Sequence, residues 1–239
     1  MKIRPTGLKL ITILCAAAFV SPAATITLNA IDSGYYLANG THNPSLENYL
    51  TGFTGTEYRS FFVFDLSSVS GTINSATLRL FNPEVSQFLH GYVSPDPSET
   101  LNFYDVTTPA AAITGNAAGI AGFNDLGSGT LYGSRSVSAA NNGTVIETAL
   151  NSSAIAAMSS ANGLFLLGGA VGTVNGPSDQ YVFGFSMVDF VPDHTRQLVL
   201  DFTSVPEPST ASLALFGTIL VLARGADLLV RGRRPRRPC

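Results

Sequence analysis

The sequence predicts an all-β domain, an antiparallel β-sandwich of the jelly-roll type with about nine strands. Two observations predict it. Short apolar or alternating runs recur between residues 25 and 202 and are separated by turn residues, a pattern typical of antiparallel strands and not of helices or βαβ units. About nine such runs over about 180 residues, with no repeat period linking them, fit a double-sheet jelly roll best.

Three runs have the clearest strand pattern. They are residues 25–31, which alternate, residues 58–66, which are nearly continuously apolar, and residues 76–80, whose Ala, Leu and Leu share a face. Six further strands are expected over residues 101–106, 130–137, 144–150, 164–167, 181–186 and 197–202. The Ala-rich residues 109–121 and residues 152–161 depart from the pattern. Because Asn151 is a good helix N-cap, we expect these two segments to be short helices or loops.

The N-terminus has the three parts of a signal peptide: a basic start, an apolar stretch over residues 10–20, and small residues after it. Ser21 and Ala23 are small at both recognition positions, which predicts cleavage after Ala23. A permanent anchor is the alternative, but about 11 apolar residues fall short of the ~20 that span a bilayer. We therefore expect export by the Sec route and removal of residues 1–23 by signal peptidase.

Residues 204–239 contain a proline-rich strip, an apolar segment over residues 211–223 and an arginine-rich end, in that order. The prolines disfavour helix and keep the strip extended, while the arginines hold the end of the chain on the cytoplasmic side. The apolar segment is predicted to be a transmembrane helix, although Arg224 and Asp227 interrupt it. The strip itself consists of Val205, Pro206, Glu207, Pro208 and Ser209.

This C-terminal arrangement resembles the PEP-CTERM sorting signal of exported bacterial proteins. The resemblance implies that a membrane exosortase recognises the Pro-Glu-Pro strip and removes the tail, so that the protein contacts the membrane only through the tail before processing. A permanent membrane anchor is the alternative. The predicted organisation is a signal peptide over residues 1–23, a β-sandwich over residues 24–203 and a sorting tail over residues 204–239.

The central domain has a second resemblance, carried by residues 58–67, 71–80 and 195–200. These segments look like parts of the DNRLRE-type jelly-roll domains of bacterial surface proteins, although Gln197 stands where that family has a proline. The resemblance implies a sandwich similar to carbohydrate-binding modules. Such a fold hosts many functions and does not identify one.

Charge is unevenly distributed along the chain. The four arginines of residues 24–204, set against 14 of the 16 acidic residues, give this region a formal charge of −10. An acidic, lysine-free domain repels phosphate backbones, which argues against nucleic-acid binding. The only cysteines, Cys15 and Cys239, lie in the terminal segments, so apolar burial must stabilise the domain without disulfides.

No catalytic motif is present in the sequence, neither a nucleophile elbow nor a zinc, phosphate-loop or dithiol motif. A glycosidase would need two facing carboxylates, and the chain has no Trp for sugar stacking. We therefore predict no catalytic residues and no cofactor. Acids that could in principle supply such a pair are Glu57, Asp65, Asp105 and Glu147, although loop and edge-strand charges are the favoured interpretation. The histidines, His42, His90 and His194, have no partner at metal-ligand spacing and are expected on the surface.

Two kinds of ligand remain to be weighed. Calcium would suit the oxygen-rich residues 32–43 and 175–179, but neither segment alternates like an EF-hand loop, so ordinary turns are the favoured interpretation. Four tyrosines could form a sugar-stacking face, but rim packing at strand ends is the favoured interpretation. They are Tyr35, Tyr36, Tyr49 and Tyr92.

The predicted function is that of a non-enzymatic exported protein of the bacterial cell surface or extracellular matrix, processed by an exosortase and associated with extracellular polysaccharide in a biofilm. A carbohydrate-binding adhesion module is the first alternative. A glycan-active enzyme is the second.

Overall fold

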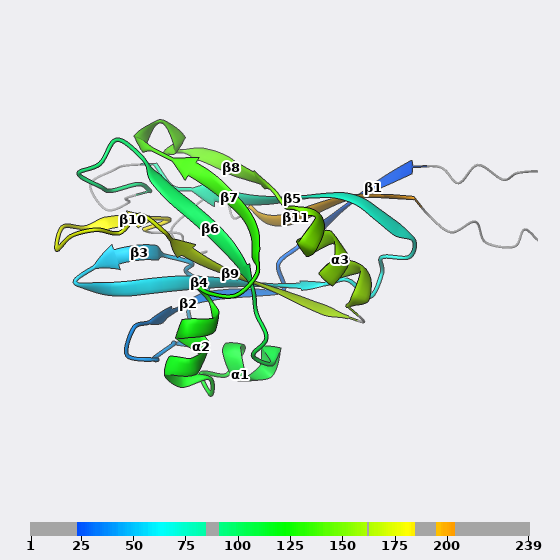
Figure 1. Ribbon diagram of the computed structural model, residues 1–239, viewed down its shortest axis with the longest axis horizontal. Helices are drawn as coiled ribbons and strands as arrows, with labels where there is room; N and C mark the ends of the chain where they lie inside the picture. The colour runs from blue at the N-terminus through cyan, green and yellow to red at the C-terminus, as the bar shows by residue number, and fades with distance from the viewer. Residues whose placement is uncertain (1–22, 85–90, 162, 185–194, 204–239) are drawn as a thin grey trace, which may run out of the picture. The chain divides into compact units, whose positions relative to one another are not determined.

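The computed structural model describes residues 23–84, 91–161, 163–184 and 195–203, all within one compact unit, Ala23–Val205. Two antiparallel sheets face each other in this unit (Figure 1). The predicted antiparallel all-β fold is therefore confirmed at the level of a sandwich-like domain. The predicted signal peptide before residue 23 and the predicted sorting tail lie outside the described residues.

The smaller sheet has four strands in the order β1-β11-β5-β8. All neighbours pair antiparallel, and β1 pairs with β11 along its whole length, from Ala23 opposite Thr203 to Asn29 opposite Gln197. The strands are β1 (Ala23–Asn29), β5 (Thr72–Asn82), β8 (Thr144–Ala149) and β11 (Arg196–Thr203). The first and last described strands are thus neighbours, and the ends of the domain meet at one edge.

The larger sheet has seven strands, six of them in the order β10-β3-β4-β9-β6-β7, while β2 also pairs with β4. Its strands are β2 (Asp32–Leu37), β3 (Thr51–Thr54), β4 (Thr56–Asp65), β6 (Glu99–Asp105), β7 (Leu131–Val137), β9 (Leu164–Val171) and β10 (Gln180–Val182). Each of the nine predicted ranges overlaps a strand of the two sheets, although the range 181–186 does so only at residues 181 and 182.

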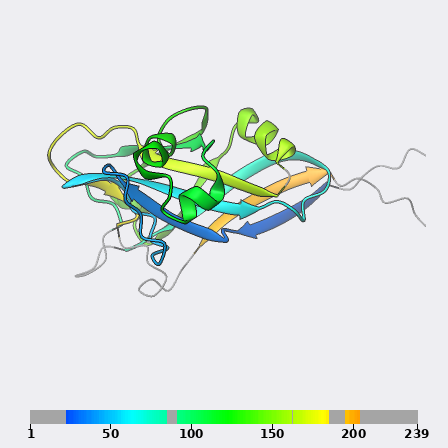
Figure 2. The same cartoon turned by 90° about the horizontal axis from the view of Figure 1, so that it is seen from below.

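Short helices lie where the strand pattern fails. They are α1 (Ala110–Thr114), α2 (Gly119–Asp125), a 3-10 turn η1 (Ala139–Asn141) and α3 (Ser152–Ser160). The predicted cap is confirmed: the Asn151 side chain accepts hydrogen bonds from the backbone N–H groups of Ser153 and Ala154 at 3.0 and 3.1 Å. In the views of Figures 1 and 2, α1 and α2 lie on the outer side of the larger sheet and α3 packs near β5 and β7.

The main apolar cluster lies between the sheets. Leu78 and Leu200 of the smaller sheet and Phe62 and Phe64 of the larger one are fully buried in it. A second cluster lies under α1 and α2 on the other face of the larger sheet, where Phe61 and other side chains are buried. Because β4 is covered on both faces, its run from residue 61 to 64 is apolar without alternation.

Two strands, β2 and β3, were not predicted. Their sequences carry polar residues and glycine, which are typical of turns. In β2 the glycine is required by packing, because a Cβ atom on Gly34 would lie 2.7 Å from the His42 ring and 2.8 Å from that of Phe61. Among the described residues, no helix is long and apolar enough to cross a membrane. The predicted sorting helix lies outside them.

Candidate functional site

The four tyrosines do not form a common sugar-stacking face. Tyr36 is fully buried and donates its hydroxyl to the Ile113 carbonyl at 2.7 Å, and Tyr49 and Tyr92 are also buried in apolar clusters. Only Tyr35 is half-buried, and its ring packs edge-on against Tyr58. The hydroxyls of Tyr36, Tyr49 and Tyr92 donate to backbone carbonyls inside the domain. These amphipathic rings therefore serve packing and present no common stacking surface.

The candidate carboxylates do not form a pair. Glu57 and Asp65 lie at opposite ends of β4, Asp105 ends β6, and Glu147 lies on the other sheet. Each has a local structural partner: Glu57 binds Arg59 at 2.8 Å, and Asp65 accepts a hydrogen bond from the Ser67 N–H at 2.9 Å. Asp105 accepts from the Thr130 N–H at 2.5 Å. The structure therefore does not bring these four residues into one site.

His42 is buried, contrary to the prediction of a surface position, whereas His90 and His194 lie outside the described residues. Its ring stacks on Tyr36 and packs edge-on against Phe61, with centroids 5.1 Å apart in both pairs. Burial lowers the pKa of His42 below its ordinary value. The neutral imidazole thus acts as part of the apolar packing between β2 and α1.

The two oxygen-rich segments have different structures. Residues 32–37 form β2, and after it Asn39 and Asn43 accept hydrogen bonds from backbone N–H groups two residues later, as in ordinary turns. The second segment is held by Gln180, whose side-chain N–H group contacts Asp96, Glu99 and Asn175 at 3.0 to 3.2 Å. Within the described part of the chain, no group of three or more His, Cys, Asp and Glu side chains is placed to hold a metal.

A row of polar side chains crosses the outer face of the smaller sheet. Asn29, Gln197, Arg79 and Glu147 are direct cross-strand neighbours on its four strands. Arg79 donates to Glu147 at 3.0 Å and to Gln197 at 2.8 Å, and Gln197 donates to Asn29 at 3.1 Å. A planar, hydrogen-bonded row is thereby held on a rigid sheet.

A second polar row runs parallel to the first. Thr25 and Ser75 donate their hydroxyls to the two oxygens of Asp201 at 2.6 and 2.8 Å. These hydrogen bonds lower the pKa of Asp201, which keeps the carboxylate charged. Hydrogen-bonding groups therefore cover this face across β1, β11 and β5.

The surface between the two rows is hollowed. A depression of about 330 Å³ lies on this face and is lined by Thr27, Thr77, Arg79, Glu147 and Val199. A second depression, of about 380 Å³, lies elsewhere on the domain. Arg79 uses two of its five N–H donors in the contacts above, and Glu147 is 59 % exposed. The face can therefore offer donors and acceptors to a hydroxyl-rich ligand, although it has no aromatic platform.

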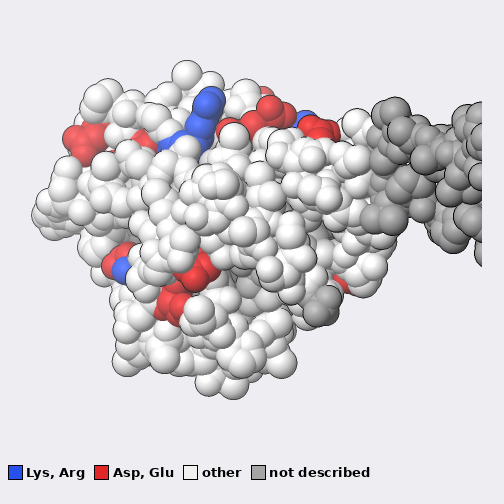
Figure 3. All heavy atoms as spheres, turned by 45° about the vertical axis from the view of Figure 1, so that its right-hand side comes forward, with Lys and Arg blue, Asp and Glu red and all other residues white. Residues whose placement is uncertain are grey.

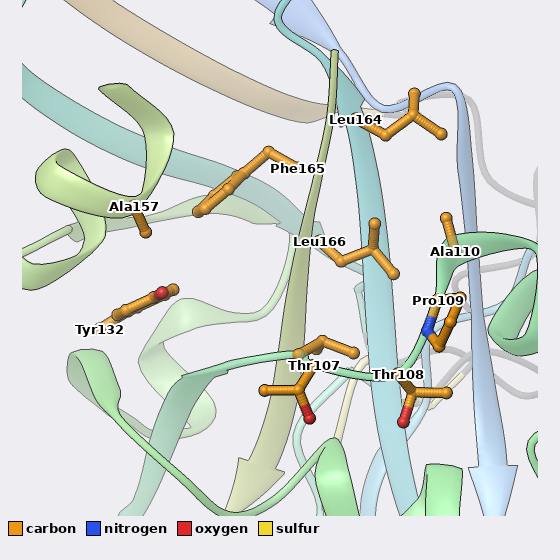
Figure 4. A pocket seen from close by; sticks show the side chains of 10 residues that line it. Thr107, Thr108, Pro109, Ala110, Tyr132, Ala157, Leu164, Phe165 and Leu166 are labelled. Atoms are coloured by element: carbon orange, nitrogen blue, oxygen red, sulfur yellow. The ribbon is translucent and has the colours of Figure 1, made fainter. Parts of the chain in front are cut away.

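The larger of the two depressions has both polar and apolar groups in its wall (Figure 4). It lies between the residues after β6, β7, α3 and β9, and its wall includes the stacked pair Tyr132 and Phe165, whose centroids are 6.0 Å apart. Leu164 is 49 % exposed at one end. Burial, together with the nearby Asp105 charge, raises the pKa of Tyr132, so its hydroxyl stays protonated in this groove.

Figure 3 shows one face of the domain, on which Asp and Glu lie in small groups between uncharged residues. Arg196, which is 12 % exposed, reaches Glu47 at 2.6 Å, and Arg59 lies 4.2 Å over the Phe123 ring. Three of the four arginines of this domain are thus engaged with acidic partners, since Arg79 and Arg59 also bind Glu147 and Glu57. No basic surface suited to a phosphate backbone is formed by these three side chains.

The sequence matches no protein-family model, and no curated protein matches it. The polar rows were not predicted as a site. The available signal was the alternate polar residues of single strands, Thr25, Thr27 and Asn29 on β1 and Ser75, Thr77 and Arg79 on β5. On β11 only Gln197 and Asp201 continue it, and joining these residues into rows requires the strand order.

Proposed function

We propose that this chain is a non-enzymatic exported protein of the bacterial cell surface or extracellular matrix, trimmed at both ends and associated with extracellular polysaccharide. The observation that supports the proposal is the extent of the compact unit, Ala23–Val205. The predicted cuts, after Ala23 and near Pro206, fall at its two ends. Cleavage there removes only Ala23 from the described strands.

We also propose the jelly-roll assignment and the likeness to DNRLRE-type domains for this sandwich. The strand orders β1-β11-β5-β8 and β4-β9-β6-β7 support it, because two interleaved sheets of four strands, with the first strand beside the last, are what a jelly roll requires. In this interpretation β2, β3 and β10 are additions to the second sheet.

The test of the export proposal is the mass of the protein outside the producing cell. We expect a chain that begins at Ala24 and ends near Pro206. Glu207→Ala should retain the arginine-rich tail, whereas Asp227→Asn, a change in the tail but outside the Pro-Glu-Pro strip, should be trimmed normally. Trimming of the Glu207 variant would show that an exosortase does not recognise this strip.

A carbohydrate-binding adhesion module is the second candidate, and the polar rows of the smaller sheet favour it. Side chains held rigidly by their neighbours bind a ligand with less loss of conformational entropy. We expect Arg79→Ala to weaken binding of extracellular polysaccharide, because both Gln197 and Glu147 lose their partner. Arg135→Ala on β7 is the matched control. Equal binding by both variants, or none by the unaltered folded chain, would remove this candidate.

A further inference from the structure

The free edge of the smaller sheet is formed by β1. Among the described residues, only β11 pairs with it, and no described segment runs along its other side in Figure 2. The Ala30 N–H points towards β11 and donates to the Arg196 carbonyl at 2.7 Å. Because successive residues of a strand point their backbone groups to opposite sides, Thr25 and Thr27 direct theirs to the open edge.

This edge lacks the usual protection against pairing with another chain. Edge strands are normally kept short or blocked by charges, prolines or bulges. β1 has seven residues, none charged and none proline, and its register with β11 is unbroken. The other edge strands differ: β10 has three residues, β2 carries Asp32, β8 carries Glu147, and β7 carries Arg135 and a pairing irregularity.

We propose that β1 pairs antiparallel with β1 of a second copy of this chain, centred on Ile26, and joins the two smaller sheets into one of eight strands. In this register Thr25 of one copy lies opposite Thr27 of the other, a favourable cross-strand pair. On the inner face Ile26 lies opposite Ile26. The side chains of Ile26 and Leu28 are only partly buried in a single copy, and pairing covers them further.

The charge distribution favours a second copy at this edge. Two domains of formal charge −10 repel each other wherever their acids meet. The acid nearest this edge in the row is Asp201 on β11. With two β1 strands between them, the two Asp201 carboxylates would be at least about 14 Å apart, given ~4.8 Å between strands, and this exceeds the Debye length of ~8 Å. The edge thus lets two acidic domains pair with little repulsion.

The test compares the full-length chain in density-matched detergent with charge variants by sedimentation equilibrium. We expect the unaltered chain to form dimers. In T25K/T27K each introduced ammonium faces another across the pair, which should weaken the dimer by about tenfold or more. T25E/T27E should behave alike, and an equimolar mixture of the two variants should recover dimers.

Thr77→Lys is the matched control, because Thr77 lies on the same face but inside the sheet. It should leave the dimer unchanged. Hydrogen exchange measured residue by residue gives a second readout. The Thr25 and Thr27 amides should be protected in the unaltered chain and exposed in T25K/T27K, while the Leu198 and Leu200 amides report that the sheet is still folded. A monomeric unaltered chain, or T25K/T27K dimers as stable as the original, would overturn the proposal.

Discussion

The stability of α3 gives a prediction whose size follows from the structure. The Asn151 side chain makes three hydrogen bonds: its oxygen accepts from Ser153 and Ala154, and its N–H group donates to the Leu131 carbonyl at 2.7 Å. The residue therefore both caps α3 and ties the helix to the start of β7. Asn151→Ala removes all three contacts.

The expected loss is about 2 kcal/mol of unfolding free energy. Losing an N-cap costs ~1 kcal/mol, and a net hydrogen bond contributes ~1 kcal/mol. The Leu131 residue is 42 % exposed, so water can hydrate its carbonyl in the variant, and no penalty for a buried unpaired group is added. Asn151→Asp keeps the two caps and loses the donor to Leu131, so it should cost about half as much.

Urea unfolding followed by circular dichroism measures these losses. The midpoint should fall in the order unaltered chain, Asn151→Asp, Asn151→Ala, with an unchanged slope, because the surface exposed on unfolding is the same. A loss under about 0.5 kcal/mol for Asn151→Ala would show that the cap does not stabilise this domain. Equal losses for the two variants would assign the effect to the Leu131 contact alone.

Two further predictions concern packing and pH. In Gly168→Ala the new Cβ would lie 2.5 Å from the Leu126 carbonyl oxygen, a backbone atom that cannot rotate away. We therefore expect the unfolding free energy to fall by about 1–3 kcal/mol. Gly176→Ala is the control and should change it little, because no atom lies within 4 Å of that Cβ. His42 has a lowered pKa in the fold, so the unfolded chain binds more protons, and the unfolding free energy should fall as pH drops below its ordinary value of 6.5. His42→Gln should remove this slope, and an unchanged slope in that variant would exclude His42 as its source. Burial raises the pKa of Asp32, so its protonation adds to the unfolding free energy as the pH falls. This opposite effect occurs at lower pH, closer to the ordinary Asp value of 3.8.

The strands were predictable because most of them alternate or are covered on both faces. β2 and β3 were not, since Gly34 and Gly52 indicate turns when read alone and are explained only by atoms distant in sequence. A Cβ on Gly52 would lie 2.2 Å from the Gln180 carbonyl oxygen, which follows from the pairing of β3 with β10. The residues around a glycine in the sequence do not show which distant backbone atoms lie close to it in the fold.

The candidate site was less predictable than the fold. The polar row of Arg79, Gln197 and their neighbours joins segments far apart in the chain, so it exists only once the strand order is known. The tyrosines were misplaced for a related reason. An aromatic ring with a hydroxyl suits either a surface rim or a core with a nearby acceptor, and the acceptor of Tyr36 lies on α1, 77 residues later.

The proposed pairing and the proposed trimming constrain each other. β11 ends at Thr203, beside the start of β1. In the proposed register the pairing centre is Ile26, and Thr203 lies opposite Ala23, at the end of the strand. Removing residues 204–239 therefore takes away no residue of the paired edge. The trimmed protein should dimerise as strongly as the full-length chain does in detergent. Sedimentation equilibrium of the two forms checks this, and a monomeric trimmed protein would show that the two proposals cannot both hold.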